Sequence, residues 1–182
     1  ISEKDGFNNL YLCQSNKPSM KQITSFKWVI KDILGFEKGG NNVIISGTGD
    51  DPRETKIFKV NLKNGKAIDI TPIEGTHDGL VSYDGKYIIN SFSNLKNPLQ
   101  IDIINVEKNK RETIYNAKNP LEDYNLGKIE FLTLKADDNK TNLYAKIIKP
   151  NDFDPNKKYP VLLYVYGGPH AQLVVNNWLA DT

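Results

Sequence analysis

The sequence predicts a mainly-β chain in two parts, a run of antiparallel strands up to residue 118 and then the opening of an α/β sheet. Three observations predict this fold class. Apolar and polar residues alternate at period two through most of the first part, and a strand–turn–strand pattern recurs there at a fixed offset. The second part contains one run, residues 161–166, that is apolar on both faces. Alternation is typical of half-buried strands, and a doubly apolar run is typical of a central strand covered on both sides.

Short alternating segments separated by turn residues predict the strands of the first part. Phe58, Val60 and Leu62 share one face of such a segment. Asn64-Gly65 and Asp84-Gly85 suit hairpin turns because these residues tolerate positive φ. No amphipathic helix of ten residues is predicted before residue 118. The other predicted strands are residues 9–13, 28–35, 43–47, 67–71, 87–92, 99–103 and 112–115.

A repeat with a period of about 44 residues runs through the first part. Residues 61–70 recur as residues 105–114, and each copy is a strand, a polar turn and a second strand. Such a period with four strands per unit is typical of a β-propeller blade, while an antiparallel sandwich with coincidental turns is the alternative. The predicted blades are a partial one over residues 1–24, a full one over 28–71 and another over 78–115.

The pattern changes after Asn119-Pro120. Residues 128–135 and 142–149 alternate again and predict two strands joined by a polar turn. A proline-bounded loop then leads into residues 161–166, which end in Gly167-Gly168-Pro169. We therefore divide the chain into residues 1–118 and residues 119–182.

Tyr166, the last residue of the doubly apolar run, is the candidate site residue. Ligands of open α/β sheets bind at the carboxyl ends of the strands, and glycines there let the backbone approach a reacting group. A tyrosine hydroxyl in this position can donate a hydrogen bond to an oxyanion that develops during acyl transfer. A tight turn after a core strand is the alternative interpretation of the same residues.

Composition excludes several classes of protein. The net charge is +2 and no stretch gathers five like charges, so neither nucleic acid nor a charged membrane surface is an expected partner. No apolar run reaches the roughly 18 residues of a membrane span. Cys13 is the single cysteine and is expected to be buried, and the two histidines are His77 and His170. We expect no metal and no cofactor, a turn-satisfying role for His77, and a supporting role for His170.

Residues 157–174 resemble the start of the catalytic domain in the prolyl oligopeptidase superfamily, within its bacterial dipeptidyl peptidase IV and prolyl tripeptidyl peptidase branch. Upstream, residues 2–11, 22–28, 75–77 and 82–87 resemble landmarks of the last propeller blades in that branch. The resemblance therefore covers essentially the whole chain. One departure is Phe26, where relatives often have glycine.

The resemblance implies that residues 1–118 are the C-terminal blades of a β-propeller and residues 119–182 the first strands of an α/β-hydrolase domain. It implies a parent serine peptidase that releases di- or tripeptides after proline, with Tyr166 in the oxyanion hole. An acylaminoacyl or oligopeptidase-type relative is one alternative, and a non-catalytic β binding or structural module is another.

The resemblance also implies where the remaining parts of such an enzyme lie. The catalytic serine of the family sits in a Gly-x-Ser-x-Gly pattern, which these 182 residues do not contain. We therefore expect this chain to be a fragment that is inactive alone and that self-associates through exposed strand edges. The expected partner is a peptide with an N-terminal Xaa-Pro. The parent could be a homodimer, and its expected location is the bacterial periplasm or cell envelope.

Overall fold

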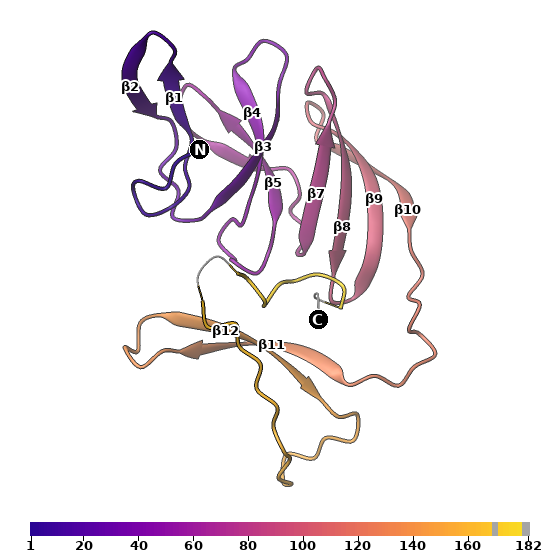
Figure 1. The fold of residues 1–182 in the computed structure, drawn as a ribbon. Coiled ribbons are helices and arrows are strands. Elements are labelled where there is room, and N and C mark those ends of the chain that lie inside the picture. Colours follow the sequence, from indigo (N-terminus) through magenta and orange to yellow (C-terminus); the bar gives the residue numbers. More distant parts are fainter. Residues whose placement is uncertain (169–170, 180–182) are drawn as a thin grey trace.

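The computed structural model describes residues 1–168 and 171–179, and these residues form strands and no helix. Figure 1 shows an N-terminal hairpin, two four-stranded sheets side by side, and a second hairpin across the lower ends of the sheets. The predicted mainly-β, propeller-type character is therefore confirmed. The strands are β1 (Tyr11–Gln14), β2 (Lys17–Gln22), β3 (Ile30–Phe36), β4 (Asn42–Gly47), β5 (Lys56–Asn61), β6 (Ala67–Asp69), β7 (Thr76–Val81), β8 (Tyr87–Asn94), β9 (Asn97–Asn105), β10 (Lys110–Asn116), β11 (Lys128–Lys135) and β12 (Asn142–Lys149).

Each four-stranded sheet is an antiparallel meander, the arrangement expected of a propeller blade. The strand orders are β3-β4-β5-β6 and β10-β9-β8-β7. Between β5 and β6 the chain turns at Gly65, whose φ of 69° is left-handed and suits glycine. The two sheets span residues 30–69 and 76–116, which closely match the predicted full blades over 28–71 and 78–115.

Strand β4 is buried on both faces because it lies between two cores. Val43 and Ile45 pack with Leu10 from the N-terminal segment, whereas Ile44 packs with Ile88 from the second sheet. Side chains alternate across a strand, so neighbouring residues of β4 enter different cores. The first sheet is thus the middle layer of a stack, with the N-terminal segment on one side and the second sheet on the other.

In the first part of the chain, one strand is absent from the predicted set and one prediction is wrong. The strand is β7, in which Asp78 and Gly79 have low strand propensity. Pairing with β8 along its whole length nevertheless holds β7 in the sheet. Cys13, predicted to be buried, is exposed because it lies on β1, which pairs only with β2 among the described strands.

The hairpin β11–β12 has the bounds predicted from the sequence. Its pairing runs without a shift from Lys128 opposite Lys149 to Lys135 opposite Asn142. The turn is closed by Asp138, whose carboxylate accepts hydrogen bonds from two backbone N–H groups at 2.8 Å. The hydrogen bond from the Thr141 hydroxyl, followed by these two backbone bonds, lowers the pKa of Asp138.

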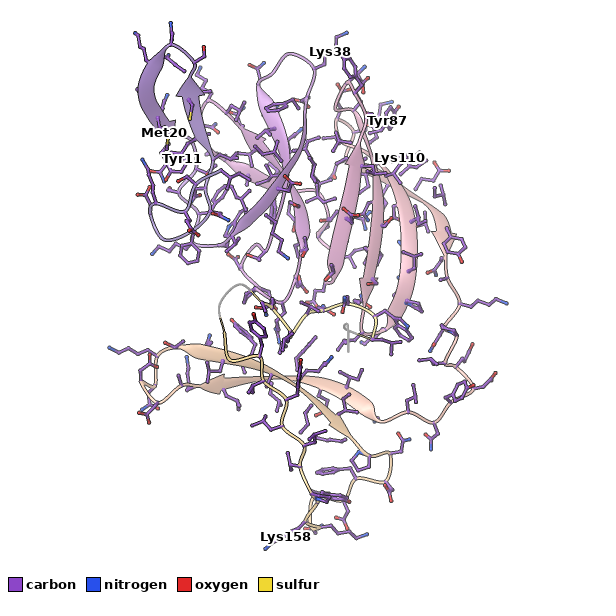
Figure 2. The ribbon with its side chains drawn as sticks, viewed as in Figure 1. Tyr11, Met20, Lys38, Tyr87, Lys110 and Lys158 are labelled. Atoms are coloured by element: carbon purple, nitrogen blue, oxygen red, sulfur yellow. The ribbon has the colours of Figure 1, made fainter. Side chains whose placement is uncertain are left out.

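The predicted central strand over residues 161–166 is wrong. The run has no strand pairing, and its side chains are exposed, Leu162 to 96%. A central strand needs hydrogen-bonding neighbours and cover on both faces, and no other described segment supplies either. The loop before the run carries Lys158 at the tip farthest from the sheets (Figure 2). The first strands of an α/β-hydrolase domain therefore stay a prediction.

Candidate functional site

Tyr166 lies directly before a sharp glycine turn. Gly167 has a φ of 66°, a left-handed conformation that suits glycine. A Cβ added to Gly168 would lie 2.9 Å from Cε1 of Tyr166. Glycine at both positions therefore lets the chain turn and leaves room for the tyrosine ring.

A hollow of about 670 Å³ opens beside Tyr166. One wall is the start of β12, including Leu143 and Tyr144. The other walls are residues 164–168 and residues 171–174. Chain segments far apart in the sequence thus border one open hollow, and its lining is largely aromatic and aliphatic with a few polar groups.

The hydroxyl of Tyr166 is available to a ligand. The side chain is 57% exposed and makes no hydrogen bond to any other described residue. A phenol can donate one hydrogen bond and accept others. Its position at the rim of the hollow allows it to donate to an oxygen of a bound molecule.

Asn176 anchors the segment that follows the hollow. Its backbone N–H donates to the carbonyl of Arg53 at 2.7 Å, and its Nδ2 donates to Oε1 of Glu54 at 3.1 Å. Its carbonyl accepts from the hydroxyl of Thr76 at 3.1 Å, and its Oδ1 accepts from the backbone N–H of Leu95 at 3.4 Å. All its backbone and side-chain polar groups are therefore used to fix this segment on the two sheets.

Sequence reasoning found Tyr166 but missed Tyr144, Arg53 and Asn176. An apolar run ending in glycines marks Tyr166 locally. The others matter through contacts with distant residues, such as the bond between Asn176 and Glu54. No local pattern of residues could have revealed them.

His77 has a structural role, as expected from the sequence. It is 2% exposed and stacks on Phe92 with ring centres 4.8 Å apart. Its Nε2 lies 2.9 Å from the carbonyl oxygen of Ile73 in the turn before β7, and its Nδ1 lies 3.0 Å from Oδ1 of Asn90. Burial lowers the pKa of His77, and these two hydrogen bonds only partly oppose that effect.

No other candidate among the described residues lies at the hollow. Ser46, the one serine next to a Gly-x-Gly sequence, lies buried within β4. His170 lies outside the described residues. Within residues 1–168 and 171–179, no three His, Cys, Asp or Glu side chains gather to hold a metal ion. The same residues contain no helix long and apolar enough to cross a membrane.

Comparison with known proteins places these features in context. A family model described as the dipeptidyl peptidase IV N-terminal region matches residues 1–99. The crystal structure of Porphyromonas gingivalis dipeptidyl peptidase 4 matches with a TM-score of 0.86 at 29% sequence identity, over 99% of this chain and 27% of that one. A candidate dipeptidyl aminopeptidase IV from Bacteroides ovatus matches with a TM-score of 0.88 at 34% identity, over 100% of this chain and 28% of that one.

Curated relatives give the same result. Dipeptidyl peptidase 8 of Mus musculus is 31% identical over 176 residues, which are 86% of this chain and 19% of that protein. The chain thus spans less than a third of the length of each of these relatives. The structural matches extend over both sheets, the hairpin β11–β12 and the segment with Tyr166.

Proposed function

Because the chain belongs to the family of the dipeptidyl peptidase IV N-terminal region, we propose that the whole protein is a serine peptidase acting on peptide amino termini. Its substrates are peptides with an N-terminal Xaa-Pro, from which it releases di- or tripeptides after proline. The names of the three relatives reported above, two dipeptidyl peptidases and a dipeptidyl aminopeptidase, support this substrate class.

The single observation that carries the chemical proposal is the position of Tyr166. Its side chain lines a hollow, its hydroxyl makes no hydrogen bond to another described residue, and two glycines follow it in the chain. A donor held in this way suits an oxygen that gains negative charge during a reaction.

In the proposed mechanism a serine hydroxyl loses its proton to a base and attacks the carbonyl carbon of the proline, on the acyl side of the bond that is cleaved. The carbonyl π electrons move to oxygen, and the Tyr166 O–H donates a hydrogen bond to that oxyanion. Collapse of the intermediate expels the amine of the remaining peptide, which takes the proton from the base. Water then hydrolyses the acyl-enzyme. The nucleophile and its partners lie outside these 182 residues in this proposal.

The test uses the whole protein with a chromogenic Xaa-Pro substrate. We expect Tyr166→Phe to lower kcat by about 10²–10³, because it removes one donor to the oxyanion and little else. Tyr124→Phe is the matched control, since Tyr124 is an exposed tyrosine in the same part of the chain and makes no side-chain hydrogen bond to a described residue. If Tyr166→Phe keeps more than about a tenth of the wild-type kcat, Tyr166 does not stabilise the oxyanion.

We further propose that residues 1–118 belong to a propeller and residues 119–182 to the catalytic domain. The last strand of the second sheet ends at Asn116 and the next strand starts at Lys128, which supports a boundary in between. The 182-residue chain alone is then inactive toward the same substrate and unlabelled by a serine-directed phosphonate. The periplasm or cell envelope is the proposed location of the whole protein, and a homodimer its proposed form.

A further inference from the structure

The side chain of Arg53 is fixed within the loop between β4 and β5. Its Nε and Nη2 donate to the two carboxylate oxygens of Asp51 at 2.9 and 2.6 Å, and its backbone N–H donates to Asp51 Oδ1 at 2.9 Å. These hydrogen bonds raise the pKa of Arg53 and lower the pKa of Asp51. A bidentate pair also fixes the plane of the guanidinium. Arg53 therefore presents one defined face to the neighbouring hairpin.

That face of Arg53 lies over β11–β12. The guanidinium carbon is 4.9 Å from the ring centre of Phe131 and 5.2 Å from the ring centre of Tyr144. Tyr144 pairs with Thr133, two residues beyond Phe131, so the two rings are diagonal neighbours on one face of the hairpin. A fixed guanidinium above two rings is a directional contact, because the ring faces attract cations.

The backbone of the same residue holds the C-terminal segment. The carbonyl of Arg53 accepts from the backbone N–H of Asn176, and the next residue, Glu54, accepts from Asn176 Nδ2. Figure 1 shows this segment running between the sheets and the hairpin. One short loop of the first sheet thus contacts both the hairpin and the segment that follows the glycine turn.

The two segments that Arg53 contacts both line the hollow beside Tyr166. Tyr144 lines it from the hairpin, and residues 171–174 line it from the segment that Asn176 anchors. We propose that Arg53 is a positioning residue, which sets the place of the Tyr166 hydroxyl by holding two walls of the hollow together. The catalytic consequence rests on the proposed function, whereas the positioning can be measured without any activity.

The first experiment measures positioning in the whole protein by hydrogen exchange. We expect Arg53→Ala to speed exchange of the Asn176 amide, which donates to the Arg53 carbonyl, by about tenfold, because the loop that holds it loses its fixed geometry. Arg53→Lys should do nearly the same, since lysine keeps the charge but cannot form the bidentate pair or stack flat.

The matched control for this experiment is Lys149→Gln. Lys149 also combines an ion pair, 2.6 Å to Glu130, with a cation–π contact, 5.2 Å to Phe153, but it does not contact the loop of Arg53. Its substitution should leave exchange of the Asn176 amide unchanged. Equal exchange in wild type and Arg53→Lys would overturn the positioning role. The lysine variant keeps the test valid if Arg53→Ala does not fold.

The second experiment measures the catalytic consequence in the whole protein. Arg53→Lys should lower kcat and kcat/KM equally, since a displaced oxyanion donor weakens only the transition state. In a Tyr166→Phe background the same substitution should change kcat by less than about twofold, because residues that act through one another are not additive.

The outcomes of the two experiments separate the two proposals. If Arg53→Lys lowers kcat by the same factor with and without the Tyr166 hydroxyl, Arg53 does not act through Tyr166 and the inference fails. If Tyr166→Phe has no effect on kcat, the proposed function of Tyr166 fails, and the exchange experiment alone decides the role of Arg53.

Discussion

At the scale of single residues, His77 shows how burial sets a chemical property. Its ring lies between the two sheets with both nitrogens next to oxygen atoms, yet desolvation dominates and its pKa is lowered. The positive charges of Arg111 and Lys56 act in the same direction. The folded chain therefore holds His77 neutral at a pH where the unfolded chain begins to protonate it.

We expect the free energy of unfolding to fall as the pH is lowered from about 7.5 to about 5.5. The unfolded chain binds more protons than the folded chain below the unfolded pKa of 6.5, so stability is complete above it and declines below it. Denaturant unfolding at several pH values measures the effect.

The control variants assign this pH effect to one histidine. His77→Gln should remove the pH dependence and cost about 1–3 kcal/mol above pH 7, because it breaks buried hydrogen bonds, and the cost should shrink as the pH is lowered. His170→Gln should keep the dependence. If His170→Gln removes the pH dependence and His77→Gln keeps it, the effect comes from His170 and the prediction for His77 is wrong.

The sequence predicts the role of some residues and not of others. Tyr166 is recognisable because its neighbours in the sequence, an apolar run and two glycines, are also what matters in the structure. Arg53 and Asn176 are ordinary residues of polar loops, and their contacts join positions more than a hundred residues apart. Such contacts depend on how whole sheets are placed, which local patterns do not encode.

At the scale of elements, β4 packs the first sheet against the second. Ile44 is fully buried between the two sheets, whereas its neighbours Val43 and Ile45 pack into the core beneath the N-terminal segment. A central strand of this kind receives contacts from both faces, and its side chains have little room to adjust.

We expect Ile44→Ala to destabilise the chain by about 2–5 kcal/mol, because the cavity between two sheets cannot collapse easily. Ile68 on β6 is the matched control, since it is 62% exposed. Ile68→Ala should change the free energy of unfolding by no more than about 0.5 kcal/mol in the same denaturant titration. Similar losses for both variants would show that β4 is not the central layer.

The same scale shows when a pattern suffices to predict a strand. β11 and β12 have the predicted bounds because alternation and a closing turn are both local, and each strand finds its partner within a few residues. Residues 161–166 have the stronger apolar pattern and yet form no strand. A doubly apolar run forms a strand only where other segments cover both of its faces. Among the described residues, no segment covers residues 161–166 in this way.

At the scale of the whole molecule, apolar surface is concentrated in that run. Six consecutive apolar side chains are each more than half exposed, and β10 and β6 end their sheets as unpaired edges among the described strands. Exposed apolar runs and free strand edges pair readily with other chains.

We expect the purified 182-residue chain to self-associate, which light scattering measures. Leu162→Lys should reduce the association because it places a charge in the middle of the run. Leu80→Lys on β7 is the control, since Leu80 is 71% exposed but stands outside the run. A monomer at high concentration would contradict the expectation for the wild-type chain.

The anchoring of Asn176 also has a consequence for how the molecule forms. Its bonds to Glu54, Thr76 and Leu95 close loops of 122, 100 and 81 residues. Contacts of such high contact order form late, because the entropy of closing the loop is lost before the contact can compensate it. During synthesis both sheets can fold before Asn176 leaves the ribosome. The surroundings of Tyr166 are therefore assembled after the two sheets, on a scaffold that is already in place.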